Sequence, residues 1–110
     1  MSRREQLEVM LAKDPNDTFL RYALAMELES ASEFDASIGM FRGLMQDSPP
    51  YVPAFFMLGQ LLARINRVEE TRTVLGEGIE QAREQNDNHA AGEMSEFLAS
   101  LGQPGESAMD

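Results

Sequence analysis

The strongest constraint on the fold is an internal repeat. When residues 51–82 are shifted back along the chain by 34 residues, apolar and small side chains fall on positions of the same kind. The matched pairs are Leu58 with Leu24, Gly59 with Ala25, Leu62 with Leu28, Val68 with Phe34, Thr71 with Ser37, Leu75 with Phe41 and Ile79 with Met45. A second shift carries Phe41 to Leu7 and Met45 to Leu11. A period of this length is typical of helical repeats, which stack into a scaffold that presents a surface.

Apolar side chains also recur at helical spacing within each period. The segments with this spacing are 2–13, 18–30, 33–46, 52–64, 68–85 and 89–101. Segment 18–30 is apolar on nearly all sides, so we expect it to be an inner helix. Ser32 with Asp35, and Asn66 with Glu69 one period later, resemble capping boxes and predict two helix starts.

Small residues stand at several positions inside the predicted helices. Ala25 and Gly59 occupy equivalent positions and would let the two helices of a hairpin approach closely. Gly76 and Gly78 lie within segment 68–85, where each costs ~1 kcal/mol relative to alanine. These two glycines either permit a close helix crossing or make this helix less stable and more flexible.

The composition disfavours several classes of protein. The formal net charge is −10 at pH 7, which opposes binding to nucleic acid, including RNA binding by helical repeats, and to anionic membranes. The chain has no cysteine, so it contains no disulfide and no cysteine zinc site. The first residues lack the apolar core of a signal peptide, and no run approaches ~20 apolar residues. We therefore expect a soluble, cytoplasmic protein.

The acidic side chains are concentrated toward the C-terminus. From residue 76 onward there are eight of them and one basic side chain, Arg83, a net charge of −7. This stretch is either a solvated face that keeps the chain soluble or a docking strip for a cationic partner.

No arrangement of residues indicates catalysis. The single histidine, His89, and Glu93 four residues later offer two metal ligands on one helical face, which is too few for a stable site. Adjacent carboxylates on a helix point in different directions, so they do not share a proton. The chain has no glycine-rich phosphate loop and no nucleophile elbow. We predict a protein that is not an enzyme and has no metal site or cofactor.

The two full periods resemble the tetratricopeptide repeat family, whose unit is a helix-turn-helix of 34 residues. The second period carries the family's positions as Phe55, Leu58, Gly59, Leu62, Thr71, Leu75 and Gly78. The first period carries them as Leu24, Ala25, Leu28, Ser37, Phe41 and Leu44, with Pro49 in the proline position. Arg21 departs from the pattern at a large aromatic position, which loosens its hairpin. Arg83 replaces the second proline and lets its helix continue toward Gln85.

The resemblance implies an all-α fold of antiparallel helix-turn-helix repeats, stacked as a short right-handed α-solenoid of about six helices. Its parts are a half repeat at 2–15, repeat one at 18–49, repeat two at 52–85 and a terminal capping helix at 89–101. Together they form one domain, 1–102, and 103–110 is expected to be a flexible tail.

The resemblance also implies where a partner binds. In this family the first helix of each unit lines an inner surface that holds extended peptides or helices. The candidate partner-binding residues on this lining are Phe19, Tyr22, Met26, Phe56, Gln60 and Arg64. Aromatic and methionine side chains favour an apolar segment, so we predict a non-catalytic scaffold that binds a protein or peptide partner. The alternative is that the last helix or the other hairpin covers some of these side chains.

Self-assembly is a second hypothesis. The half repeat leaves Leu7, Met10 and Leu11 without one neighbour, and a second copy of the chain could supply it. This hypothesis predicts a homodimer through the N-terminal half repeat.

Overall fold

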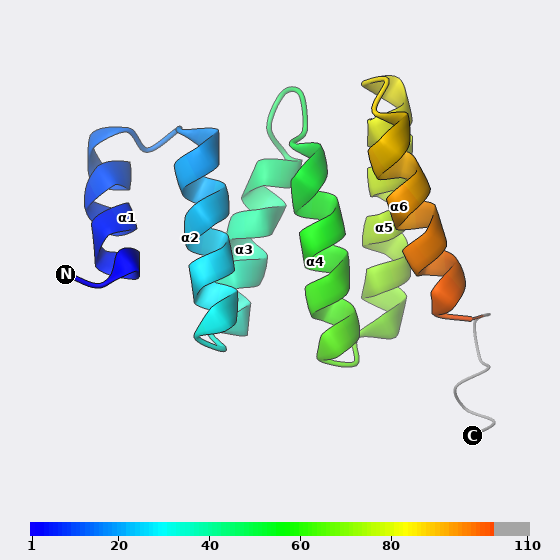
Figure 1. Cartoon of the computed structure of the whole chain (residues 1–110), viewed down its shortest axis with the longest axis horizontal. Coiled ribbons are helices and arrows are strands. Elements are labelled where there is room, and N and C mark those ends of the chain that lie inside the picture. Colours follow the sequence, from blue (N-terminus) through cyan, green and yellow to red (C-terminus); the bar gives the residue numbers. More distant parts are fainter. Residues whose placement is uncertain (103–110) are drawn as a thin grey trace. The chain divides into compact units, whose positions relative to one another are not determined.

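The computed structural model describes residues 1–102, which form six helices joined by short turns (Figure 1). The helices are α1 (Arg3–Lys13), α2 (Thr18–Ser30), α3 (Phe34–Met45), α4 (Val52–Arg64), α5 (Val68–Glu84) and α6 (Asn88–Ser100). No helix end differs from its prediction by more than one residue, and the described residues contain no strand. The predicted all-α helical repeat is therefore confirmed. The predicted tail, 103–110, lies outside the described residues.

Contacts within the chain divide it into two compact units, of which the first is residues 1–54 and the second begins at Phe55. In the first unit, α1 and α3 both pack on α2. One cluster of buried side chains joins α1 to α2 and consists of Leu7, Leu20, Ala23, Leu24 and Leu28, with Leu11 and Met40 packed against it. Since α2 is covered by both α1 and α3 and supplies four residues of this cluster, the prediction of an inner helix is confirmed.

In the second unit, three helices pack closely at two glycines, because glycine has no side chain to separate them. A Cβ atom on Gly59 of α4 would lie 2.7 Å from Leu75 Cδ2 of α5. A Cβ atom on Gly78 of α5 would lie 2.6 Å from Met94 Sδ of α6 and 2.6 Å from Phe55 Cβ of α4. Atoms of real side chains do not approach this closely, so both positions require glycine for the observed packing. The predicted close approach at Gly59 is confirmed.

The predicted capping boxes at Ser32 and Asn66 are wrong. Both residues have left-handed backbone angles, with φ of 60° and 67°, and Asn86 shares them with φ of 61°. Each of these three residues ends the helix that precedes it. The N–H of the residue that follows donates a hydrogen bond to the carbonyl five positions earlier. The distances are 2.9 Å from Glu33 to Leu28, 2.8 Å from Arg67 to Leu62 and 2.7 Å from Asp87 to Ala82. This is the Schellman motif, which satisfies the last carbonyls of a helix.

Side-chain caps occur at three other helix starts. Ser2 and Glu5 form a reciprocal capping box at α1. The Asp17 carboxylate accepts from the Leu20 N–H at 2.9 Å, and the Asp87 carboxylate accepts from the Ala90 N–H at 3.1 Å. The N-caps of α3 and α5 make no such bond.

Candidate functional site

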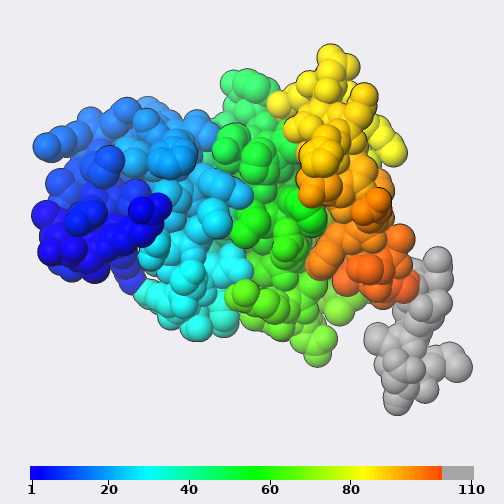
Figure 2. All heavy atoms as spheres, viewed as in Figure 1, coloured from blue at the N-terminus to red at the C-terminus, as the bar shows by residue number. Residues whose placement is uncertain are grey.

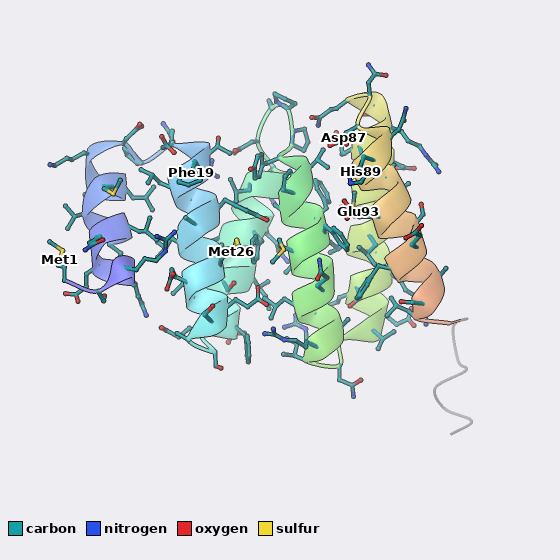
Figure 3. The ribbon with its side chains drawn as sticks, viewed as in Figure 1. Met1, Phe19, Met26, Asp87, His89 and Glu93 are labelled. Atoms are coloured by element: carbon teal, nitrogen blue, oxygen red, sulfur yellow. The ribbon has the colours of Figure 1, made fainter. Side chains whose placement is uncertain are left out.

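Three of the predicted partner-binding residues lie on one face of α2. Phe19, Tyr22 and Met26 are spaced by three and four residues, which aligns their side chains along the helix. Phe19 is 69% exposed and Met26 is 38% exposed, whereas Tyr22 is partly buried. Figure 3 shows Phe19 and Met26 along α2, and Figure 2 shows α2, in light blue, on the surface of its unit. We call these three residues the α2 face.

Aromatic contacts hold Tyr22 at the base of the α2 face. Its ring lies edge-on to that of Phe41, with centroids 6.0 Å apart, and to that of Tyr51, with centroids 5.3 Å apart. Burial raises the pKa of Tyr22 above its usual value, and the nearby Tyr51 and Glu29 raise the pKa further. The ring of Tyr22 is therefore a fixed support, while Phe19 and Met26 are the accessible side chains.

The segment between α3 and α4 contacts two neighbouring residues of α2, Arg21 and Tyr22. The Arg21 guanidinium donates two hydrogen bonds to the Asp47 carboxylate, at 2.7 Å and 3.2 Å, and Tyr22 packs on Tyr51. Arg21 occupies the position where the repeat pattern has a large aromatic residue. This bidentate ion pair connects α2 to the segment that follows α3, at the position where the pattern predicted looser packing of the hairpin.

The other three predicted residues lie on one face of α4, in the second unit. Phe56, Gln60 and Arg64 are spaced by four residues each, so their side chains point from the same side of α4. Phe56 is partly buried and meets Phe97 of α6 edge-on, with ring centroids 6.0 Å apart. Gln60 is also partly buried, and Arg64 is exposed. Within this unit, α6 therefore covers part of Phe56.

Sequence reasoning missed two aromatic residues beside the candidate ones. Tyr51 lies between helices, in a proline-rich turn, where helical periodicity carries no signal. Phe97 stands at helical spacing with Met94 in the segment predicted to be a capping helix, and the spacing alone does not separate a core residue such as Met94, which is fully buried, from one beside the site. Only the ring contacts with Tyr22 and Phe56 reveal their place.

His89 and Glu93 form an exposed pair on α6. His89 Nε2 lies 3.2 Å from a Glu93 carboxylate oxygen, and their side chains are 87% and 48% exposed (Figure 3). Residues 1–102 contain no group of three or more histidine, aspartate or glutamate side chains that could hold a metal ion. Over the same residues, no helix has the length and apolar character needed to cross a membrane.

Comparison with known proteins places the chain among solved helical repeats. No protein-family model matches it, and no curated protein matches it in sequence. A solution structure of a tetratricopeptide repeat domain protein from Salinibacter ruber is 30% identical over 80% of this chain and 89% of that one, with a TM-score of 0.75. A crystal structure of a tetratricopeptide repeat domain protein from S. ruber is 29% identical over 77% and 94%, with a TM-score of 0.69.

A protein from Bordetella parapertussis is also similar. Its solution structure is 27% identical over 92% of this chain and 88% of that one, with a TM-score of 0.78. The 34-residue period and the paired helices of this chain fit the helix-turn-helix unit of a tetratricopeptide repeat. The chain belongs to the tetratricopeptide repeat family.

Proposed function

We propose that this protein is a non-catalytic interaction module that binds an apolar peptide or helix of a protein partner on the α2 face. The tetratricopeptide repeat fold is a protein-interaction fold and is typically non-catalytic. The observation that carries the proposal is the exposure of Phe19, at 69%, two helical turns from Met26. Aromatic rings supply large contact area at low entropy cost, and methionine adapts to the shape of a partner.

The proposal includes Phe56, Gln60 and Arg64 of α4 as further partner contacts, since the repeat pattern assigns them to the equivalent helix of the second period. It requires no cofactor and no catalytic group, and the net charge of −10 favours a protein partner over nucleic acid. The proposed setting is the cytoplasm, which cell fractionation would test.

Affinity capture from native lysate, read by mass spectrometry, tests the proposal. The test variant is Phe19→Ser with Met26→Ser, because these side chains are exposed and their loss spares the core. The matched control is Val9→Ser with Met10→Ser on α1, where the exposed fractions are 45% and 49%. We expect a partner that the wild type and the control capture and the test variant loses. Equal capture by all three proteins would contradict the proposal.

Self-association through α1 is the second candidate function. Of the three residues predicted to lack a neighbour, Leu7 is buried and Leu11 packs against the core, so that part of the prediction is wrong. Met10 is exposed, as is Val9 beside it. Sedimentation velocity at rising protein concentration measures this association. Under this second proposal the wild type dimerises and Val9→Ser with Met10→Ser remains a monomer. A wild type that stays monomeric at all concentrations would exclude it.

A further inference from the structure

Methionine is the only sulfur-containing side chain of this protein. The chain has eight methionines and no cysteine, so no thiol of its own competes for an oxidant. A peroxide converts the thioether of methionine into a sulfoxide, which is polar where the thioether is apolar. Because the peroxide must reach the sulfur atom, exposed methionines react before buried ones.

The methionines of residues 1–102 differ widely in exposure. Three of them are exposed, and these are Met1, Met10 and Met26. The partly buried ones are Met40, Met45 and Met57. Met94 is fully buried, and its sulfur atom packs against Gly78 of α5. An oxidant therefore reaches the exposed side chains before it reaches the interior of the second unit.

Met26 is the exposed methionine that lies on the α2 face (Figure 3). In its thioether form it adapts to an apolar partner. A sulfoxide oxygen at the same place is a hydrogen-bond acceptor, and an apolar segment offers it no donor. Burying that oxygen under the segment costs free energy, so oxidation of Met26 opposes binding at the α2 face.

We propose that Met26 is a reversible oxidation site that controls binding at the α2 face. The sulfur attacks one oxygen of hydrogen peroxide, the O–O bond breaks, and the other oxygen leaves as water. Sulfur loses two electrons, and the peroxide gains them. Methionine sulfoxide reductases reverse the step with two electrons from a dithiol and release the oxygen as water. This proposal rests on the proposed function and adds the regulation of the same site.

The rate of oxidation at each methionine tests the chemical part of the proposal. The full-length protein is treated with hydrogen peroxide and mapped by mass spectrometry of its peptides. We expect Met26 to react on the order of tenfold faster than Met94, and circular dichroism to show that the helices persist. Reaction in concentrated guanidinium chloride is the control, because unfolding removes the difference in burial. Equal rates in the folded protein, or loss of the helices when Met26 is oxidised, would overturn the proposal.

Binding is measured with a peptide selected from a random library on phage, one that binds the wild type and not Phe19→Ser with Met26→Ser. Each protein is compared with its own untreated form. Oxidation should raise the dissociation constant about tenfold for the wild type, and repair by methionine sulfoxide reductases should reverse the rise. Met26→Leu has no sulfur at this position, so oxidation should not change its dissociation constant. Met10→Leu is the matched control, because it removes an exposed methionine of α1 and should respond like the wild type.

The outcomes separate this proposal from the proposed function. If oxidation leaves the dissociation constant of the wild type unchanged, or raises that of Met26→Leu equally, Met26 does not control binding and the proposed function stands. If no selected peptide depends on Phe19 and Met26, both proposals are wrong.

Discussion

The two glycines inside α5 have different surroundings, although they are only two residues apart. Apart from the surrounding backbone of α5 itself, Gly76 has no heavy atom within 4 Å of the position that a Cβ would occupy, so it does not serve a helix crossing. At Gly78 the same atom would meet Met94 Sδ and Phe55 Cβ at 2.6 Å. Of the two roles that the sequence left open for these glycines, close crossing applies to Gly78 alone.

We expect alanine to have opposite effects at these positions. Gly76→Ala gains helix propensity and should stabilise the protein by about 1 kcal/mol. Gly78→Ala makes the same gain but overpacks the crossing, at a cost of about 1–3 kcal/mol. Urea unfolding should therefore give Gly78→Ala a free energy of unfolding about 1–3 kcal/mol below that of Gly76→Ala. Equal values would mean that α6 moves aside without cost.

Tyr22 should make stability depend on pH in the alkaline range. Its pKa is raised in the folded protein, mainly by burial, whereas an unfolded tyrosine ionises near pH ~10. The folded state therefore holds this proton more tightly. The resulting stability is fully present below about pH 10 and is lost as pH rises toward the folded pKa.

Tyr22→Phe isolates this effect, because it keeps the ring and removes the ionisable group. Unfolding by urea from about pH 8 to about pH 11 should show a steeper loss of stability in the wild type than in the variant. The chain has two tyrosines, and Tyr51 is present in both proteins, so comparing the two proteins isolates Tyr22. Parallel losses in the two proteins would show that Tyr22 titrates like an unfolded tyrosine.

At the scale of the helix, the three Schellman ends differ in how well their central residue tolerates left-handed backbone angles. Asparagine tolerates the left-handed conformation that Asn66 and Asn86 adopt, but Ser32 adopts it at φ of 60° without that advantage. We expect Ser32→Gly to stabilise the protein by about 1 kcal/mol. Ala31→Gly is the control, because Ala31 has an ordinary φ of −86° and glycine there should only destabilise. Chemical denaturation of both variants would measure the difference, and a loss of stability in Ser32→Gly would refute the argument.

The helices could be predicted more reliably than their ends could be explained. Apolar periodicity spans three or four turns, so it locates each helix even when single residues mislead. Serine and asparagine, by contrast, suit both an N-cap and a left-handed C-terminal position. Ser32 with Asp35 fits the capping-box pattern, and only the backbone angle of Ser32 shows that it ends α2.

For the whole molecule, the 34-residue period predicted the fold class, because each repeat buries its apolar face against its neighbours. The period also predicted which side chains share a face of α2 and of α4. The period did not predict what fraction of each of these side chains is exposed. The contact of Phe56 with Phe97 and the pairing of Arg21 with Asp47 join residues whose spacing is not part of the repeat, so they appear only in three dimensions.

The net charge of −10 should make the stability of the whole chain depend on salt. Repulsion among excess carboxylates destabilises the compact state, and salt screens it. Salt also weakens ion pairs such as Arg3 with Glu27, but exposed pairs contribute less than about 1 kcal/mol each. We therefore expect the melting temperature at pH 7 to rise by a few degrees, or about 1 kcal/mol, between ~50 and ~500 mM sodium chloride.

The same measurement at about pH 5 distinguishes repulsion from a general effect of salt. At this pH some carboxylates are protonated, so the net charge is less negative and the repulsion is weaker. The rise in melting temperature with salt should therefore be smaller. An equal rise at both values of pH would point to exclusion of salt from the protein surface instead. A fall in melting temperature at pH 7 would mean that pairs such as Arg21 with Asp47, where the arginine side chain is only 19% exposed, outweigh the repulsion.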